Sequence, residues 1–440
     1  MMAPESPGTP TAQSGDAEFV LLGMPDVHGS IRGKALRPAA FQSALDNGTV
    51  MTDLWLGLDP VDAPITDYEH FGIRSGAADL LLVPDSETLR ELAWRPGWRI
   101  CLATPSWPDG SCCDLASREV LRAVLTAMAA LGYEVLAAFE YEVRIWDRDA
   151  EPLSSGLSYH LNEIGRFSAL LSSLVPALDG LGIELEAVHT EAGPGLLELN
   201  IAARPGLRAA DDAAFVKFAV KDVATSLGLR ASFLAKTMPL EEGSSGHVHL
   251  SLWRDGTNAF APANPDDGAP PVSAAAIAGL LEHLPAASLL LNPTVNSYKR
   301  LVPGFFAPVN VSWGYQNRSA SIRAIHSARS EHSRLECRRP GADANPYLAL
   351  AALVASAGDG IRHESVPPAP LAGDVAERAD LVALPNSLES ALDAFRSDEV
   401  LRAALGEEFS KYYAISRAWE LRAWQKAVSD WERERYLRTV

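Results

Sequence analysis

The chain is poor in cysteine, with only four among its 440 residues. Cys112 and Cys113 are adjacent, and no two cysteines have the C-x-x-C spacing. This usage argues against a disulfide framework and against a thiolate zinc site, and it favours a reducing compartment. Glycine (32) and proline (30) have ordinary abundance, which excludes a collagen-like or wholly disordered chain.

Positive charge and long apolar runs are also scarce. Lys and Arg total 38 against 56 Asp and Glu, a net charge of −18, so we expect no nucleic-acid partner. No run reaches the roughly 18 apolar residues of a membrane span, and the nearest, Val272–Leu291, is interrupted by Glu282, His283 and Pro285. Residues 1–16 lack the features of a signal peptide and predict a disordered tail. We therefore expect a cytoplasmic protein without membrane contact.

Hydrophobic residues make up 47% of the chain, and its length is typical of two domains. The Gly-, Pro- and Trp-rich stretch Trp94–Asp114 indicates a junction, so we expect an N-terminal domain of short strands over 17–110 and a second domain over 111–440. Ser117–Leu131 has helical periodicity, after which strands and helices alternate, typical of an α/β or α+β protein. A final helical segment over 398–437 carries three tryptophans suited to packing in the core or between subunits, Trp419, Trp424 and Trp431.

Five runs of strand-forming residues carry polar side chains at alternate positions. Residues two apart share one face of a strand, so each run has a polar and an apolar face. One such run alone is typical of a strand with its polar side in water. Five together favour a single surface around a polar cavity. The polar positions are Glu140, Glu142 and Arg144; Glu191 and Glu198; His247, His249 and Ser251; Ser321 and Arg323; and Arg334, Glu336 and Arg338.

The residue types on these faces indicate a chemistry. Five glutamates and one or two histidines suit Mg²⁺ or Mn²⁺ better than zinc. Two such ions beside an arginine cluster are typical of phosphoryl transfer, because they neutralise charge on the phosphate oxygens. Familiar nucleotide motifs are absent: Gly29–Lys34 is one residue too short for a P-loop, and Gly193–Glu198 lacks a third glycine. The basic cluster is Lys299, Arg300, Arg318, Arg323, Arg329, Arg334, Arg338 and Arg339.

Eight segments, in order from about Asp26 to the C-terminus, resemble the glutamine synthetase superfamily. They are DVHGSIRGK, the E-x-E of FEYEVRIW, HTEAGPG followed by Glu198, GSSGHVHLSL, NPTVNSYKRLVPG, NRSASIR, RLECRRP and ANPYLALAALVASAGDG. The resemblance implies an α+β fold with an N-terminal β-grasp domain and a larger catalytic domain, whose curved antiparallel sheet is flanked by helices. It also implies a homo-oligomer, a dodecamer of two stacked rings with active sites shared between neighbouring subunits.

The resemblance further implies a role for each motif residue. The implied reaction transfers the γ-phosphate of ATP to the side-chain carboxylate of L-glutamate, after which an amine attacks the γ-glutamyl phosphate. Two or more Mg²⁺ or Mn²⁺ ions would be bound, the first by Glu142, Glu191 and Glu198 and the second by Glu140, His247 and Glu336. Glutamate would contact Arg300, Arg338, Gly243 and His247, and ATP would contact Glu186, His249, Ser251, Arg318, Arg323 and Arg334. The implied catalytic residues are Glu191, Arg318 and Arg323.

Three departures from the family pattern concern the acceptor. Ammonia-using members carry a glutamate on the flap after K-R-L-V-P-G, where this chain has Phe306. The D-G-S-S segment is absent, which leaves Asp53 as the one candidate for its aspartate, and G-P-G-Q has become Gly193–Leu196. Losing carboxylates and gaining an aromatic ring predicts a larger, more apolar amine pocket. The candidate pocket residues are Phe306, Leu196, Asp53 and Tyr159.

These departures favour an ATP-dependent ligase that joins the γ-carboxylate of glutamate to a small organic amine. A glutamine synthetase using ammonium is the second hypothesis. A non-catalytic scaffold is the third, disfavoured because all six metal-ligand positions are occupied. The identity of the amine stays open: a polyamine needs an acidic group at the far end of the pocket, whereas an aromatic or short alkyl amine suits Phe306 and Trp55.

Overall fold

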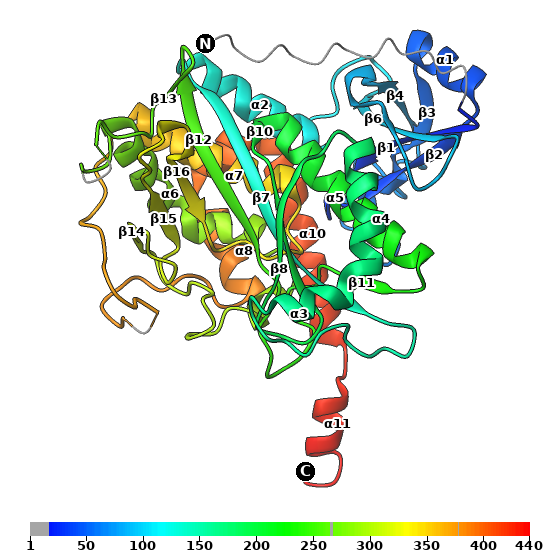
Figure 1. The fold of residues 1–440 in the computed structure, drawn as a ribbon. Coiled ribbons are helices and arrows are strands. Elements are labelled where there is room, and N and C mark those ends of the chain that lie inside the picture. Colours follow the sequence, from blue (N-terminus) through cyan, green and yellow to red (C-terminus); the bar gives the residue numbers. More distant parts are fainter. Residues whose placement is uncertain (1–16, 265–266, 377) are drawn as a thin grey trace.

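The structure is a computed structural model that describes residues 17–264, 267–376 and 378–440. The disordered tail expected over residues 1–16 lies outside the described residues. Two sheets organise the chain, a smaller one near the N-terminus and a larger one that runs through the main body (Figure 1).

The smaller sheet has six strands in the order β2-β1-β6-β4-β3, with β5 paired to β6. β1 and β6 are parallel, and the other pairs are antiparallel. One helix, α1 (Pro38–Asn47), packs on the sheet through Phe41 and Ala44. The strands are β1 (Phe19–Pro25), β2 (Ile31–Leu36), β3 (Thr49–Thr52), β4 (Asp79–Pro84), β5 (Arg90–Glu91) and β6 (Trp98–Ser106).

The larger sheet has ten strands in the order β14-β15-β16-β12-β7-β9-β8, with β10 and β11 paired to β7 and β13 paired to β12. Every pair is antiparallel except β14 with β15. The strands are β7 (Glu134–Trp146), β8 (Leu185–Thr190), β9 (Leu196–Ile201), β10 (Arg204–Pro205), β11 (Arg230–Ser232), β12 (Gly246–Arg254), β13 (Thr257–Asn258), β14 (Trp313–Tyr315), β15 (Ile322–Ile325) and β16 (Arg334–Cys337).

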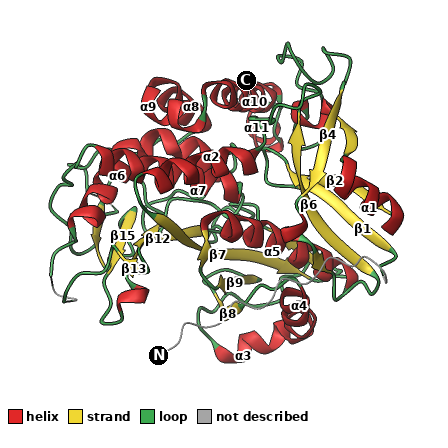
Figure 2. Ribbon diagram, turned by 90° about the horizontal axis from the view of Figure 1, so that it is seen from above, coloured by secondary structure: helices red, strands yellow, loops and turns green. Residues whose placement is uncertain are grey.

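Helices cover one face of this larger sheet and leave the other face free for a site. Figure 2 shows α2, α6 and α7 layered along one side of β7 and β12. The apolar side of β7 is buried, because Phe139, Tyr141, Val143 and Ile145 are each at most 2% exposed. The helices are α2 (Ser117–Ala130), α3 (Leu161–Ile164), α4 (Ser168–Gly180), α5 (Gly206–Ser226), α6 (Pro271–Leu291), α7 (Pro346–Arg362), α8 (Leu388–Ser397), α9 (Glu399–Leu405), α10 (Glu407–Lys426) and α11 (Asp430–Tyr436).

The α+β class is confirmed, with a small N-terminal sheet and a curved sheet flanked by helices. The domain bounds 17–110 and 111–440 stay a prediction; the smaller sheet ends at Ser106 and the larger one begins at Glu134. Helix α6 is long and apolar enough to cross a membrane by composition, but 83% of that stretch is buried inside the protein. Its apolar length is therefore accounted for by packing against α7 and α8.

The C-terminal tryptophans do not share one environment. Trp419 packs partly buried against the core, whereas Trp424 and Trp431 are 53% and 61% exposed. Figure 1 shows α11 extending away from the main body. Within the chain, core packing thus applies to Trp419 alone, and packing between subunits stays a prediction for the other two.

Candidate active site

Strand register brings the five polar faces together. The pairing of β7 with β9 sets Glu142 opposite Glu198, and the pairing of β12 with β7 sets His247 opposite Glu140. Strand β16 then sets Glu336 between two partners, His249 on β12 and Arg323 on β15. Since side chains alternate across a strand, these residues project from one face of the sheet. The predicted polar surface is therefore present.

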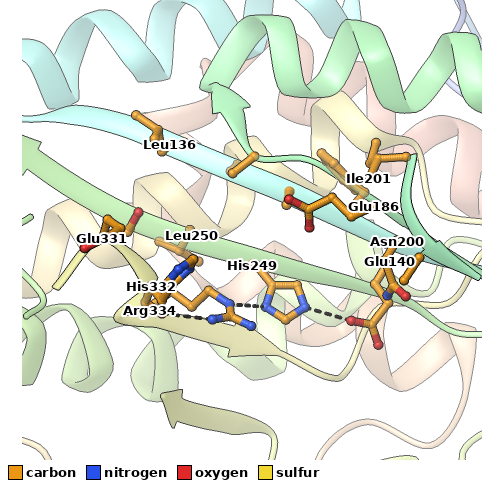
Figure 3. A pocket seen from close by; sticks show the side chains of 16 residues that line it. Leu136, Glu140, Glu186, Asn200, Ile201, His249, Leu250, Glu331, His332 and Arg334 are labelled. Carbon is orange, nitrogen blue, oxygen red and sulfur yellow. Dashed lines mark hydrogen bonds and ion pairs between the residues drawn. The ribbon is translucent and has the colours of Figure 1, made fainter. Parts of the chain in front are cut away.

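Glu140 lies at the centre of a hydrogen-bonded chain. Its carboxylate oxygens lie 3.1 Å from His247 Nδ1 and 3.0 Å from His249 Nε2. Arg334 Nε donates to His249 Nδ1 at 3.1 Å, so the Nε2 of that imidazole carries the hydrogen it donates to Glu140 (Figure 3). Burial would raise the pKa of Glu140, but the two imidazoles outweigh it and hold that pKa well below its usual range.

Glu336 is the most deeply buried carboxylate of the set, at 1% exposed. Arg338 Nη1 donates to it at 2.5 Å and Arg323 Nη1 at 2.9 Å. Burial opposes ionisation, yet His249, Arg338 and His247 lower the pKa of Glu336 to about 2. This carboxylate is therefore ionised across the physiological range, and it positions two of the predicted arginines.

A second group of acidic residues surrounds His189. Its Nε2 lies 2.9 Å from Glu191 and 3.4 Å from Glu198. Glu142 beside them accepts from the backbone N–H and the hydroxyl of Ser245, at 2.7 and 2.6 Å. Burial, followed by the charges of Glu140 and Glu142, raises the pKa of Glu198 to about 9. So many carboxylates in a buried place are stable only with added positive charge.

Two cavities meet over these strands. The first, of about 360 Å³, is lined by Glu186, Ser251 and Ile201 among others, and the second is larger, about 580 Å³. Glu140, His249 and Arg334 line both cavities, and Figure 3 shows them in the first one. The two cavities therefore adjoin as one groove beside the hydrogen-bonded chain. The predicted residues that line the second cavity are Glu140, Glu142, Tyr159, Glu191, Glu198, Gly243, His247, His249, Arg300, Phe306, Arg318, Arg323, Arg334, Glu336 and Arg338.

Two of the predicted site residues line neither cavity of their own chain. Leu196 is fully buried and does not line the second cavity. Asp53 lies in the N-terminal part, where it is 3% exposed and accepts from Ser75 Oγ at 3.1 Å. Trp55 is likewise buried in the core and away from the cavity.

Four lining residues were not predicted from the sequence: His189, Glu242, Ser245 and Phe305. His189 was detectable, because it stands two residues before Glu191 and shares its side of the extended chain. Ser245 was detectable in the same way, because it stands two residues before His247, whereas Glu242 and Phe305 lie in a loop and a turn outside any periodic pattern.

The aromatic part of the second cavity is held in unusual backbone geometry. Phe306 and Tyr159 have φ angles of 50° and 56°, a region that costs a bulky residue of order 1–3 kcal/mol and that is enriched at functional sites. The Tyr159 ring stacks on His189 with centroids 4.8 Å apart. Phe306 is 62% exposed, so its ring is available to a molecule in the cavity.

The residues present fit divalent cations. One set comprises Glu140, His249 and Glu336 and the other His189, Glu191 and Glu198, with ligand atoms in each set within 4.8 Å of one another. His247 also reaches the first set, since its Nδ1 lies 3.1 Å from Glu140 and 3.7 Å from Glu336. Carboxylate oxygens with imidazole nitrogens suit Mg²⁺ or Mn²⁺.

Cation binding predicts a pH-dependent stability. The pKa of Glu198 is about 9 in the fold against about 4.3 unfolded, so the metal-free protein should lose stability as pH rises between these values. Because a metal ion replaces the bound proton, Mn²⁺ should raise the melting temperature more at about pH 8.5 than at about pH 6. Thermal unfolding with EDTA or with Mn²⁺ measures this difference, and Glu198→Gln should remove most of it. An equal Mn²⁺ effect at both pH values would contradict the assignment.

The comparisons with known proteins agree with this geometry. Carboxylates, imidazoles and arginines on the polar face of a curved sheet are typical of sites that bind divalent ions and phosphates. The family profile described as glutamine synthetase, catalytic domain, matches residues 114–436. The chain belongs to the glutamine synthetase family and is a ligase of that family.

Relatives with different acceptors are similar to the chain to nearly the same degree. The glutamate–isopropylamine ligase of a Pseudomonas species is 36% identical over 96% of this chain and 95% of its own length. The gamma-glutamylethanolamide synthetase of Streptomyces coelicolor is 34% identical over 96% and 93%, and the glutamine synthetase of Thermus thermophilus is 34% identical over 96% of both chains. A solved GmaS–ADP complex aligns with a TM-score of 0.84 and 29% identity, covering 96% of this chain and 97% of that one.

Proposed function

We propose that the protein is an ATP-dependent ligase that joins the γ-carboxylate of L-glutamate to a small organic amine. The observation that carries this proposal is the flap: Phe306 projects into the second cavity where an ammonium site needs a carboxylate. Two relatives of similar length, the isopropylamine ligase and the ethanolamide synthetase, support an organic acceptor.

The groove suggests where each substrate binds. The nucleotide base and sugar of ATP would occupy the first cavity, against Glu186, Ser251 and His249. The phosphates would then extend past Arg334 toward Arg318 and Arg323, which line the second cavity. Divalent ions, once bound, would supply positive charge for the transferring phosphoryl group.

The proposed ligands for these ions are two carboxylates from each of the two sets, together with Glu142 and His247. Glu142, Glu191 and Glu198 would bind one ion, and Glu140, His247 and Glu336 another. Burial, together with the charges of Glu140 and Glu142, raises the pKa of Glu198, and this raised pKa supports the role.

Glutamate would be bound at the other side of the second cavity. Arg300 and Arg338 line it, and both guanidinium groups are almost fully buried and carry an Nε atom without a hydrogen-bond partner among the described residues. Gly243 lies beside them, where a Cβ atom would come within 2.4 Å of both Arg300 Cγ and the carbonyl of Ala235. Only glycine fits there without displacing Arg300 or the Ala235 backbone, so this glycine keeps Arg300 in its place at the cavity.

We also propose a ring-shaped homo-oligomer in the cytoplasm, a dodecamer in which neighbouring subunits share active sites. The distance of Asp53 from the cavity of its own chain fits a contribution to a neighbour's site. The exposed Trp424 and Trp431 fit packing between subunits.

The acceptor is tested by comparing amines. With glutamate and ATP saturating, kcat/KM should be at least about 100-fold higher for one organic amine than for ammonium, because an aromatic flap covers an alkyl group but cannot stabilise NH₄⁺ as a carboxylate does. The panel of amines is isopropylamine, methylamine, ethanolamine, putrescine, spermine and aniline. Phosphate release measures turnover, and mass spectrometry identifies the γ-glutamyl amide. Efficient use of ammonium with no turnover of any panel member would sink the organic-amine proposal and favour a glutamine synthetase.

A further inference from the structure

One carboxylate that lines the second cavity has no assigned role. Glu242 lines this cavity together with Glu191, Tyr159, Phe305 and Phe306. Its side chain is partly exposed to the cavity, and no ion pair or hydrogen bond of its carboxylate occurs among the described residues. This carboxylate is therefore free to interact with a molecule that enters.

Buried cations hold the backbone that presents Glu242. Arg144, which is fully buried, donates through Nη2 to the Glu242 carbonyl at 2.8 Å and through Nη1 to the Pro194 carbonyl at 2.6 Å. Lys236 donates to the Glu241 carbonyl, and its ammonium lies 5.3 Å from the centroid of the Phe305 ring. The turn that carries Glu242 is thus fixed beside the flap.

The surroundings of Glu242 favour a cation. Burial, with the charges of Glu142 and Glu191, raises the pKa of Glu242 to about 7. The Glu142 carboxylate already accepts a hydrogen bond from the Ser245 hydroxyl, and the Glu191 carboxylate already pairs with His189 Nε2. The flap from Pro303 to Pro308 contains no acidic residue, so Glu242 is the carboxylate beside the flap that remains for an incoming ammonium group.

We propose that Glu242 determines acceptor specificity by binding the protonated amino group of the amine, while Phe306 and Tyr159 contact its organic part. The inference rests on the proposed function, since it concerns the acceptor of that same ligase. A charge-assisted hydrogen bond from an alkylammonium to a carboxylate is among the stronger polar contacts in proteins. Aromatic rings beside it add apolar and cation–π contact.

The test compares Glu242→Gln with the wild type, and the neighbouring Glu241→Gln serves as a matched control. For the best organic amine, Glu242→Gln should raise KM about 10- to 100-fold, with the KM values for ATP and glutamate little changed. Hydroxylamine is the diagnostic acceptor, because it is largely uncharged at neutral pH and needs no carboxylate to bind a cation. Its kcat/KM should stay within about 3-fold of wild type. Glu242→Asp should recover part of the loss with the organic amine.

Other outcomes would overturn the inference. An unchanged KM for the amine means that Glu242 does not bind it. An equal loss with hydroxylamine, or a higher Mg²⁺ requirement, means that Glu242 serves glutamate or the metal ions instead. Failure of the proposed function gives a different result, because the wild type would then use ammonium alone. In that case, Glu242→Gln should lose activity with ammonium but not with hydroxylamine if this residue binds the cation.

Discussion

Glu140→Gln is expected to abolish ATP-dependent phosphate release, with a loss of about 1,000-fold or more in kcat. Glu140 accepts from both imidazoles of the site and borders both cavities. The amide keeps the size of the side chain but removes the charge that a divalent ion requires. The measurement is glutamate-dependent phosphate release at saturating ATP, over a range of Mg²⁺ and Mn²⁺ concentrations.

Glu140 is a better target than Glu336 for this purpose. Glu336 neutralises Arg323 and Arg338 in a buried place, so its removal leaves uncompensated charge and threatens the fold. The matched control is Glu134→Gln, which lies on the same strand β7 but is exposed, and it should retain full activity. Near-normal turnover of a folded Glu140→Gln protein would remove the metal assignment.

Phe306→Glu should shift acceptor preference toward ammonium by about 100-fold in the ratio of kcat/KM values, because a flap carboxylate stabilises NH₄⁺ and accepts its proton. The substitution is accessible, since Phe306 is 62% exposed and the change replaces one non-glycine residue by another at φ 50°. The shift should remain incomplete, because the D-G-S-S segment that carries a second carboxylate in ammonia-using members is absent from this chain. Competition between ammonium and the best organic amine, with both amides measured, gives the ratio directly.

The control for this second prediction is Phe306→Gln, which has the same shape as the glutamate variant without its charge. It should lose organic-amine activity through the missing ring and gain nothing with ammonium. If Phe306→Gln and Phe306→Glu show the same preference between ammonium and the organic amine, the flap acts by shape alone. The electrostatic explanation of acceptor choice would then be wrong.

The sequence was sufficient for the main features of the fold. Alternation in FEYEVRIW assigned Glu140 and Glu142 to one face and the apolar residues between them to the other, and β7 has this arrangement. The helical period over Ser117–Leu131 predicted α2, which spans Ser117–Ala130. Both patterns are local, since a strand repeats every two residues and a helix every 3.6.

Within the site, prediction succeeded where a residue belongs to a periodic strand or to a motif. His247, His249 and Glu336 were predicted in this way and line the second cavity. The prediction was less complete around the acceptor, where Leu196 is buried away from the cavity and Glu242 and Phe305 line it unpredicted. These residues lie at a strand end or in turns, where no period indicates the direction of a side chain.

The sequence by itself thus determined which residue types share a strand face, and with them the carboxylate, imidazole and arginine composition from which metal and phosphate binding is predicted. Only the tertiary structure decided which residues meet. Glu142 faces Glu198 because of strand register, and a shift of one residue would turn these carboxylates to the opposite face. The position of Glu242 depends on Arg144, 98 residues earlier in the chain. Register and buried contacts between distant segments are set by the packing of the whole core, and no local pattern in the sequence carries that information.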